Sequence, residues 1–202
     1  MQKEFGILSD ESLMESCEAI NNNAQYLSKT IDDFKNFIKG DRTKKIFNVK
    51  DDIDSFMHLV ESSIKIHNLN VILDINKDLH IDGYENELIQ CFINIFNNAK
   101  DILIENDINN KLIFISITTN NNKAIIKIKD NAGGIPEHIL PKIFEPYFTT
   151  KHQAQGTGLG LHMTYKLIVE GMNGAVEADN INYTYDGVEY VGAEFTITLP
   201  MD

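Results

Sequence analysis

The residues best suited to chemistry in this sequence lie in a glycine-rich stretch, residues 144–162, which reads FEPYFTTKHQAQGTGLGLH. Three alternating glycines, Gly156, Gly158 and Gly160, follow Lys151 and precede an apolar helical pattern. Backbone N–H groups in such a turn, together with the N-terminus of the following helix, can bind phosphate oxygens. The spacing fits neither a P-loop nor a dinucleotide-binding turn. Taken alone, the stretch is as compatible with a mobile turn as with a phosphate site.

A second candidate is Asp130, which ends the alternating sequence IIKIKD. Ile126, Ile128 and Asp130 share one face of the expected strand, so the carboxylate points toward the core. A buried, unpaired carboxylate is costly. We therefore expect Asp130 either to cap a local turn or to accept a hydrogen bond from a ligand, for which the exocyclic amine of a base is suitable. Gly133 and Gly134 follow and allow the backbone to approach such a ligand closely.

Two amides form the third candidate. Asn94 and Asn98 are four residues apart, so they share one face of an otherwise apolar helix. An amide oxygen is a hard ligand that suits a Mg²⁺ ion bridging phosphate oxygens. The alternative is a hydrogen bond from the helix to a neighbouring loop. Asn97 lies one step away and is expected to face elsewhere.

Hydrophobic patterns predict the elements that position these residues. Helices are expected over residues 50–67, 84–106 and about 158–171. Strands are expected at 46–49, 70–76, 79–82, 111–119, 123–130, 175–180 and 193–200, with Asp186-Gly187 as a turn. Because strand pairs adjoin while helices intervene, we expect an α+β fold with helices on one face of a mixed sheet. Residues 131–157 lack a regular pattern apart from a short helix at PEHILPKIF, and so long a loop favours a flexible lid over a ligand.

The N-terminal segment carries a heptad seam. Its apolar positions are Leu13, Cys17, Ile20, Ala24, Leu27, Ile31, Phe34 and Ile38. A seam of two positions per heptad favours a coiled coil or four-helix bundle over a helix packed on its own domain. Since only one such helix is present, we expect a bundle divided within its first helix.

Composition excludes several classes of protein. The net charge of −12 and the absence of a Lys/Arg cluster argue against nucleic-acid binding. The sequence has no apolar run long enough to span a membrane and no signal-peptide pattern. Cys17 and Cys91 both fall in helical patterns, so we expect buried, reduced thiols and a cytoplasmic chain. Whether the full-length protein is anchored in a membrane is left open.

Four motifs in order give these features a common explanation. NIFNNA (94–99), DNAGGI (130–135), IFEPYFTTK (143–151) and GTGLGL (156–161) resemble the N box, first glycine box, F box and second glycine box of sensor histidine kinases. Residues 47–200 thus resemble the catalytic, ATP-binding domain of that family. The wider superfamily includes DNA gyrase, the heat-shock ninety chaperones and the mismatch-repair ATPases.

The resemblance implies a two-layer α/β sandwich, with a mixed sheet packed on three helices and one long bundle-type helix before it. Asn98 would coordinate Mg²⁺, Asp130 would accept from the adenine amine, and Phe144 and Phe148 would pack the lid down. Lys151 would meet the phosphates. The full set of implied nucleotide-binding residues is Asn94, Asn98, Asp130, Gly134, Ile135, Phe148, Lys151, Gly156, Thr157, Gly158, Leu159, Gly160 and Leu161.

The resemblance also implies two domains and a reaction. Residues 1–45 would be the C-terminal part of a dimerisation and phosphotransfer hairpin, and 46–202 the catalytic domain with an ATP lid at about 131–157. The domain would bind Mg-ATP and transfer its γ-phosphate to a histidine in a two-component phosphorelay. The expected partners are a response regulator receiver domain and a second copy of the chain, which would join through the bundle.

The acceptor of the phosphate is not recognisable. The histidines are His58, His67, His80, His138, His152 and His162, and none has the sequence context of a phosphoacceptor. We therefore expect no catalytic residue within the chain, which would be a fragment lacking the acceptor histidine and its adjacent base. The sequence also departs from the family pattern at Ala132, where Gly is common, at Asp101, where Lys is common, and in having Gly174 without a second glycine.

Two other functions remain open. An ATP-hydrolysing conformational switch of the wider superfamily would need a catalytic Glu early in the helix of the Asn pair, where Glu85, Glu87 and Gln90 lie. A non-catalytic ATP-sensing module would bind nucleotide without either reaction.

Overall fold

The computed structural model describes residues 43–75, 78–151 and 156–201, together with isolated positions between residues 14 and 28. Three seam positions fall in the described set, Cys17, Ile20 and Ala24, and all are helical and exposed. The expectation that Cys17 is buried is therefore wrong in this chain, because its face of the helix is not packed against the described body. Cys91 is buried, as expected. The rest of the seam lies outside the described residues.

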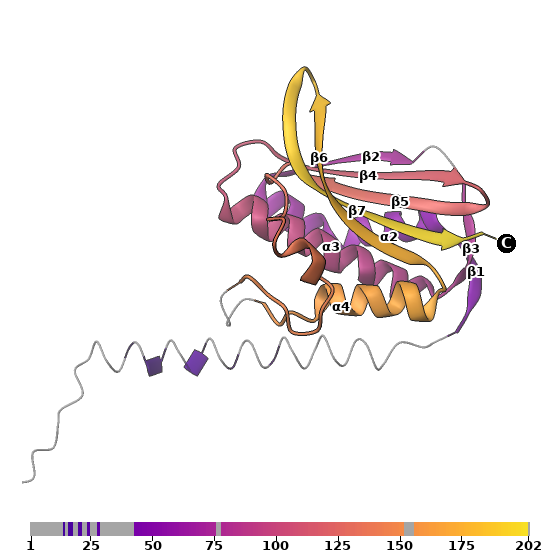
Figure 1. Cartoon of the computed structure of the whole chain (residues 1–202), viewed down its shortest axis with the longest axis horizontal. Coiled ribbons are helices and arrows are strands. Elements are labelled where there is room, and N and C mark those ends of the chain that lie inside the picture. The colour runs from indigo at the N-terminus through magenta and orange to yellow at the C-terminus, as the bar shows by residue number, and fades with distance from the viewer. Residues whose placement is uncertain are drawn as a thin grey trace, which may run out of the picture.

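The body of the chain, residues 43–201, is a mixed sheet with helices on one face (Figure 1). The sheet has the strand order β2-β4-β5-β7-β6, in which β2 and β4 are parallel and the other pairs antiparallel. A separate pair joins β1 to β3. The strands are β1 (Lys45–Asn48), β2 (Leu69–Ile75), β3 (His80–Gly83), β4 (Lys111–Asn120), β5 (Lys123–Asp130), β6 (Ala175–Tyr185) and β7 (Val188–Pro200). The helices are α2 (Val49–His67), α3 (Glu85–Glu105), the 3₁₀ turn η1 (Leu140–Lys142), and α4 (Gly160–Tyr165) continued by η2 (Lys166–Gly171). The predicted α+β sandwich is confirmed.

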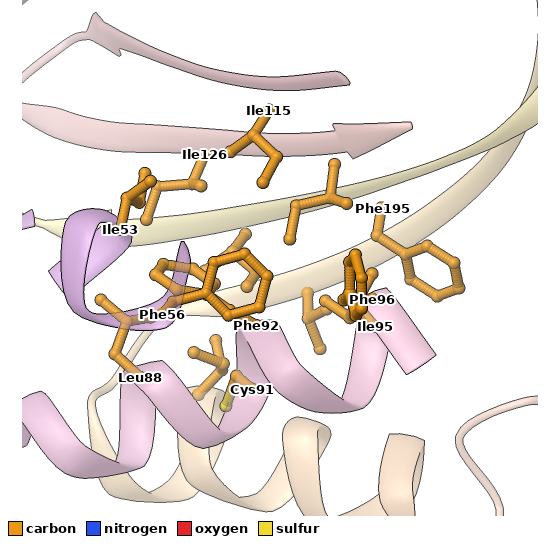
Figure 2. Packing of buried hydrophobic residues seen from close by; sticks show 14 of the residues in the cluster. Ile53, Phe56, Leu88, Cys91, Phe92, Ile95, Phe96, Ile115, Ile126 and Phe195 are labelled. Carbon is orange, nitrogen blue, oxygen red and sulfur yellow. The ribbon is translucent and has the colours of Figure 1, made fainter. Parts of the chain in front are cut away.

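The core lies between the sheet and α2 and α3. Phe56 of α2 packs edge-on against Phe92 and Phe96 of α3, with ring centroids 5.8 and 5.6 Å apart. Figure 2 shows these rings beneath Ile115 and Ile126 of the sheet. Edge-to-face aromatic packing adds to the free energy gained from burial. Because α3 is buried along this face, its polar residues on the remaining face have fixed positions.

Local signals explain where the elements begin and end. The Asn48 side chain accepts a hydrogen bond from Lys50 N at 2.9 Å and caps α2, which ends at Asn68 in a left-handed conformation. The sequence PEHILPKIF forms only a single 3₁₀ turn, because its two prolines lack N–H donors. The last helix starts at Gly160 and is completed by a π-helical stretch.

The β6–β7 hairpin is longer than its predicted strands. It reaches the two-residue turn at Asp186-Gly187, where both residues have positive φ. Figure 1 shows it extending past the rest of the sheet. Tyr183 and Tyr190 are paired across the strands, with ring centroids 5.8 Å apart. No helix in the described residues is long and apolar enough to cross a membrane.

Candidate nucleotide-binding site

A cavity of about 240 Å³ lies between α3, the carboxyl end of β5, the 131–151 loop and the start of α4. Every nucleotide-binding residue implied by the sequence lines it, except Leu159. The Leu159 carbonyl instead accepts a hydrogen bond from Met163 N at 2.8 Å and so begins α4. Phe148 lines the cavity, whereas Phe144 is partly buried and packs against Phe195 of the core, with ring centroids 6.5 Å apart. Residues distant in sequence thus meet around one space.

Asp130 lies at one end of this cavity, and the residue is 5% exposed. Its Oδ1 accepts hydrogen bonds from Ala132 N at 2.9 Å and from Ala193 N at 3.2 Å. Burial raises the pKa of this carboxyl above its ordinary value of 3.8, and the two backbone hydrogen bonds oppose that rise. The two roles left open for Asp130 are therefore compatible: one oxygen caps the local turn, and the residue still lines the cavity.

Two residues that sequence reasoning missed fix the backbone of Asp130. The Tyr183 hydroxyl donates to the Asp130 carbonyl at 2.9 Å. At Gly192 of β7, an added Cβ would lie 1.8 Å from that same carbonyl oxygen, so only glycine fits. Gly192 lies just before the strand expected at 193–200, but the structure places it inside β7. A glycine inside a strand signals a close backbone approach. That signal could have identified Gly192 but not its partner.

Asn180 of β6 holds the start of the loop. Its Oδ1 accepts from Ile135 N at 2.6 Å, and its Nδ2 donates to the Ile135 carbonyl at 2.7 Å. Gly134 has φ +85°, and a Cβ there would lie 2.6 Å from Asn180 Oδ1. Gly133 N also donates to Val191 O at 3.0 Å. Hydrogen bonds between the hairpin and both Gly133 and Ile135 thus fix the paired glycines, and local residue patterns carry no signal for these contacts.

Asn94 connects α3 to the second glycine box. Its Nδ2 donates to the Gly160 carbonyl at 3.0 Å and to Thr164 Oγ1 at 3.3 Å, and its Oδ1 accepts from Gln90 Nε2 at 3.2 Å. This is the helix-to-loop hydrogen bond considered as an alternative to a ligand role. Asn94 therefore positions the glycine turn. Within that turn Gly158 has φ +66°, and a Cβ there would lie 2.4 Å from a backbone carbon of Tyr147.

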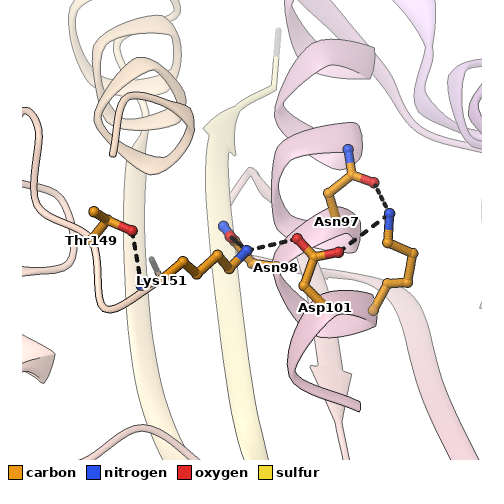
Figure 3. Close-up of polar contacts among 6 residues, drawn as sticks. Asn97, Asn98, Asp101, Thr149 and Lys151 are labelled. Carbon is orange, nitrogen blue, oxygen red and sulfur yellow. Dashed lines mark hydrogen bonds and ion pairs between the residues drawn. The ribbon is translucent and has the colours of Figure 1, made fainter. Parts of the chain in front are cut away.

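A charged network occupies the other end of the cavity (Figure 3). Lys151 Nζ donates to Asn98 Oδ1 at 3.2 Å and to Asp101 Oδ2 at 2.7 Å. Lys100 Nζ lies 3.4 Å from the other oxygen of Asp101 and donates to Asn97 Oδ1 at 3.1 Å. Asn97 and Asp101 both line the cavity, although sequence reasoning placed Asn97 elsewhere. Asp101, which stands where the family commonly has Lys, thus places a carboxylate between the ammonium groups of Lys100 and Lys151.

The histidines that the structure describes take no part in this arrangement. Of those that the structure describes, none lines the cavity. His162 Nδ1 is 3.0 Å from the Phe144 carbonyl, which is a packing contact. His152 lies outside the described residues. Over the described part of the chain, no cluster of three or more His, Cys, Asp or Glu side chains could hold a metal ion.

Comparisons with known proteins agree with this geometry. A family model described as histidine kinase-, DNA gyrase B-, and HSP90-like ATPase matches residues 83–202. Sporulation kinase A of Bacillus subtilis (strain 168) is 33% identical over 138 residues, which is 68% of this chain and 22% of that protein. The chain thus spans less than a quarter of the length of this relative.

Solved structures give the same result for the fold. The nucleotide-free catalytic domain of histidine kinase ThkA has a TM-score of 0.65 and 28% identity, over 79% of this chain and 96% of that one. ThkA in complex with the response regulator protein TrrA has a TM-score of 0.68 and 23% identity, over 98% of this chain and 54% of that one. With its motifs lining one cavity, the chain belongs to the histidine kinase-, DNA gyrase B-, and HSP90-like ATPase family and carries the ATP-binding catalytic domain of a histidine kinase.

Proposed function

We propose that the chain binds Mg-ATP in this cavity and transfers the γ-phosphate to a histidine outside the catalytic domain. One observation carries the proposal: the carboxylate of Asp130 and the amide and ammonium of Asn98 and Lys151 line the same cavity. An acceptor for a base amine and a polar site for phosphates are the two features that a nucleotide requires. The family of the chain supports the same ligand.

Each lining residue then has a role. Asp130 accepts a hydrogen bond from the adenine amine, and Gly134, Ile135 and Phe148 form the adjacent wall. Lys151 and the backbone of residues 156–161 hold the phosphates. Phosphoryl transfer depends mainly on positioning and on stabilising charge. This chain would supply both, while the acceptor histidine and its base come from elsewhere.

The residues present also fit a magnesium ion. Asn98 Oδ1 offers a hard oxygen ligand, and in this structure a cation, the Lys151 ammonium, already contacts it. Bound there with ATP, Mg²⁺ would neutralise negative charge on the phosphates. Asn98 is therefore the residue we assign to the metal, with Asn94 supporting it through the glycine turn.

The wider assembly is part of the proposal. We assign residues 1–45 to a dimerisation and phosphotransfer hairpin, 46–202 to the catalytic domain, and about 131–157 to the ATP lid. The exposed seam positions Cys17 and Ile20 support pairing with a second copy of the chain. A response regulator receiver domain is the proposed downstream partner, since a ThkA structure contains such a protein.

The test is transfer of label from γ-labelled ATP to a separately supplied helical bundle that carries the acceptor histidine. We expect Mg²⁺-dependent labelling of the bundle, abolished by Asn98→Ala. Steady phosphate release without the bundle would instead identify the ATP-hydrolysing switch. Nucleotide binding with neither outcome would identify a sensing module.

The structure gives the hydrolytic alternative little support. Glu85 forms an ion pair with Lys45, and among the described residues neither Glu85 nor Glu87 lines the cavity. A base that activates water must lie within hydrogen-bond reach of it, directly or through one further water. Gln90, which does lie near Asn94, cannot accept a proton at neutral pH.

A further inference from the structure

The Lys151 ammonium marks a point where two oxygen atoms of α3 converge. Asn98 Oδ1 is 3.2 Å from Nζ and Asp101 Oδ2 is 2.7 Å from it. The two side chains are three residues apart on one helix, so they share a face. Figure 3 shows both directed at the same ammonium group. This edge of α3 therefore binds a positive charge in the structure.

The charge is held only partly out of water. The side chains of Lys151 and Asp101 are 17% and 32% exposed. A partly exposed ion pair that includes a long, flexible Lys side chain is weak enough for a competing charge to open. Lys151 also comes from the end of the 131–151 loop, whereas Asn98 and Asp101 belong to the rigid α3. The loop residue is thus the exchangeable member of the network.

We propose that the Asn98–Asp101 edge of α3 is the cation site of the cavity, which holds the Lys151 ammonium without nucleotide and the divalent cation with it. The proposal rests on the proposed function and adds Asp101 as the second protein ligand. In exchange, Lys151 leaves the edge and contacts the phosphates. Asn98 and Asp101 fit the metal by their chemistry, because amide and carboxylate oxygens are its preferred protein ligands.

Asp101 then has opposite effects on the two forms of the nucleotide. Without a metal, its negative charge repels the phosphates and competes with them for Lys151. With a metal, the same carboxylate attracts the complex. A side chain that only restrained Lys151 would weaken binding of both forms, and one that only positioned Lys151 would strengthen both. The direction in which nucleotide affinity changes, measured with and without metal, therefore distinguishes a metal ligand from a residue that only restrains or only positions Lys151.

The experiment uses the full chain, a non-hydrolysable ATP analogue and titration calorimetry, in EDTA and in Mg²⁺. For Asp101→Asn we expect affinity in EDTA to rise about tenfold and the enhancement by Mg²⁺ to fall about a hundredfold, so that affinity in Mg²⁺ falls about tenfold. The affinity for Mn²⁺ in the presence of the analogue, measured by electron paramagnetic resonance, should fall in parallel. Tighter binding in both media, or weaker binding in both, would overturn the proposal.

Lys100→Gln is the matched control. It removes the ammonium that faces the other oxygen of Asp101, and Lys100 does not line the cavity. We expect it to leave the enhancement by Mg²⁺ unchanged, and a loss like that of Asp101→Asn would overturn the assignment. A wild-type chain that binds no analogue would refute the proposed function itself. Binding with Mg²⁺ enhancement fully kept in Asp101→Asn would refute only the role of Asp101.

Discussion

The two ends of the cavity are held by different kinds of interaction. Around Asp130 the contacts are hydrogen bonds to the backbone and a steric fit at Gly192. Around Lys151 they are ion pairs and amide contacts between side chains. The first set leaves little freedom, because Asp130 is held by its own turn at Ala132 and by the neighbouring strand β7 at Gly192 and Ala193. The second set can exchange partners when a polyanion and its metal arrive.

This difference indicates that the two ends bind different parts of the nucleotide. A base is rigid and uncharged, so a preformed wall can bind it with little further loss of side-chain and loop entropy. Phosphates and their metal carry high charge, and a network of charged side chains can adjust to them. We therefore expect changes at the Asp130 end to act on stability and on recognition of the base. Changes at the Lys151 end should act through charge and metal.

The largest expected effect is at Gly192. An Ala side chain would place a Cβ 1.8 Å from the Asp130 carbonyl oxygen, so β5 and β7 must separate. We expect Gly192→Ala to lower the free energy of unfolding by about 3 kcal/mol, measured by urea denaturation. Thr196→Ala on the same strand is the control and should cost under about 1 kcal/mol. Equal effects of the two variants would show that the Asp130 end is not sterically fixed.

Gly192 also illustrates what the sequence could foretell. Periodicity predicted the helices and the seven strands of the described body, because burial of one face imposes a period of 3.6 or 2 on the residues. The strands β6 and β7 were predicted too short, because their outer residues, 181–185 and 188–192, pair only with each other beyond the core-facing part of the sheet. Which strand would face Asp130 depends on sheet order, and local spacing carries no information about that.

The next effect in size concerns Asp130 itself. In Asp130→Asn, the side-chain oxygen can still accept from Ala132 N and Ala193 N, while the charge that would face the adenine amine is lost. A hydrogen bond to a charged group contributes about 1.5–3 kcal/mol, so affinity for ATP should fall roughly 10- to 100-fold. Calorimetry measures this change. Unaltered affinity would mean that Asp130 serves the fold alone.

The pH dependence separates an effect of Asp130 on folding from its effect on ATP binding. Stability and affinity are each measured against pH in the wild type and in Asp130→Asn. Burial raises the pKa of Asp130 in the folded chain above the ordinary value of 3.8. Stability therefore falls as pH rises from that value to the folded pKa, by at most about 1.4 kcal/mol per pH unit, and is constant above it. Affinity for ATP should rise over the same range as the carboxylate ionises.

Asp52 also titrates, because burial raises its pKa to about 8, so the pH dependence is judged as the difference between the wild type and Asp130→Asn. Opposite slopes of stability and affinity in that difference would confirm the role of Asp130. Parallel slopes would contradict it.

The residues of the candidate site were easier to predict from the sequence than the residues that hold them in place. Residue type and order were enough to select Asp130, Asn98 and Lys151, because few side chains can serve a base amine, a metal or a phosphate. The contacts of Asn180 and Tyr183 arise only once the hairpin folds beside the loop. Asp101 was noticed as a departure, but its pairing with Lys151 depends on the path of a loop without regular structure.

The smallest expected effect is at Asn180, and it tests whether the two ends of the cavity are independent. Asn180→Ala removes both hydrogen bonds to Ile135, which are exposed, so stability should fall by only about 1 kcal/mol. The wall at Gly134 and Ile135 loosens, and affinity for ATP should fall about two- to fivefold, with Asn182→Ala as the control on the same strand. Because only the end of the cavity that binds the base is altered, calorimetry should show an equal loss of affinity for ADP. A change in the ratio of ATP to ADP affinity would mean that the loop transmits the loss of this clamp to Lys151, and the division between a rigid end and an exchangeable end would then fail.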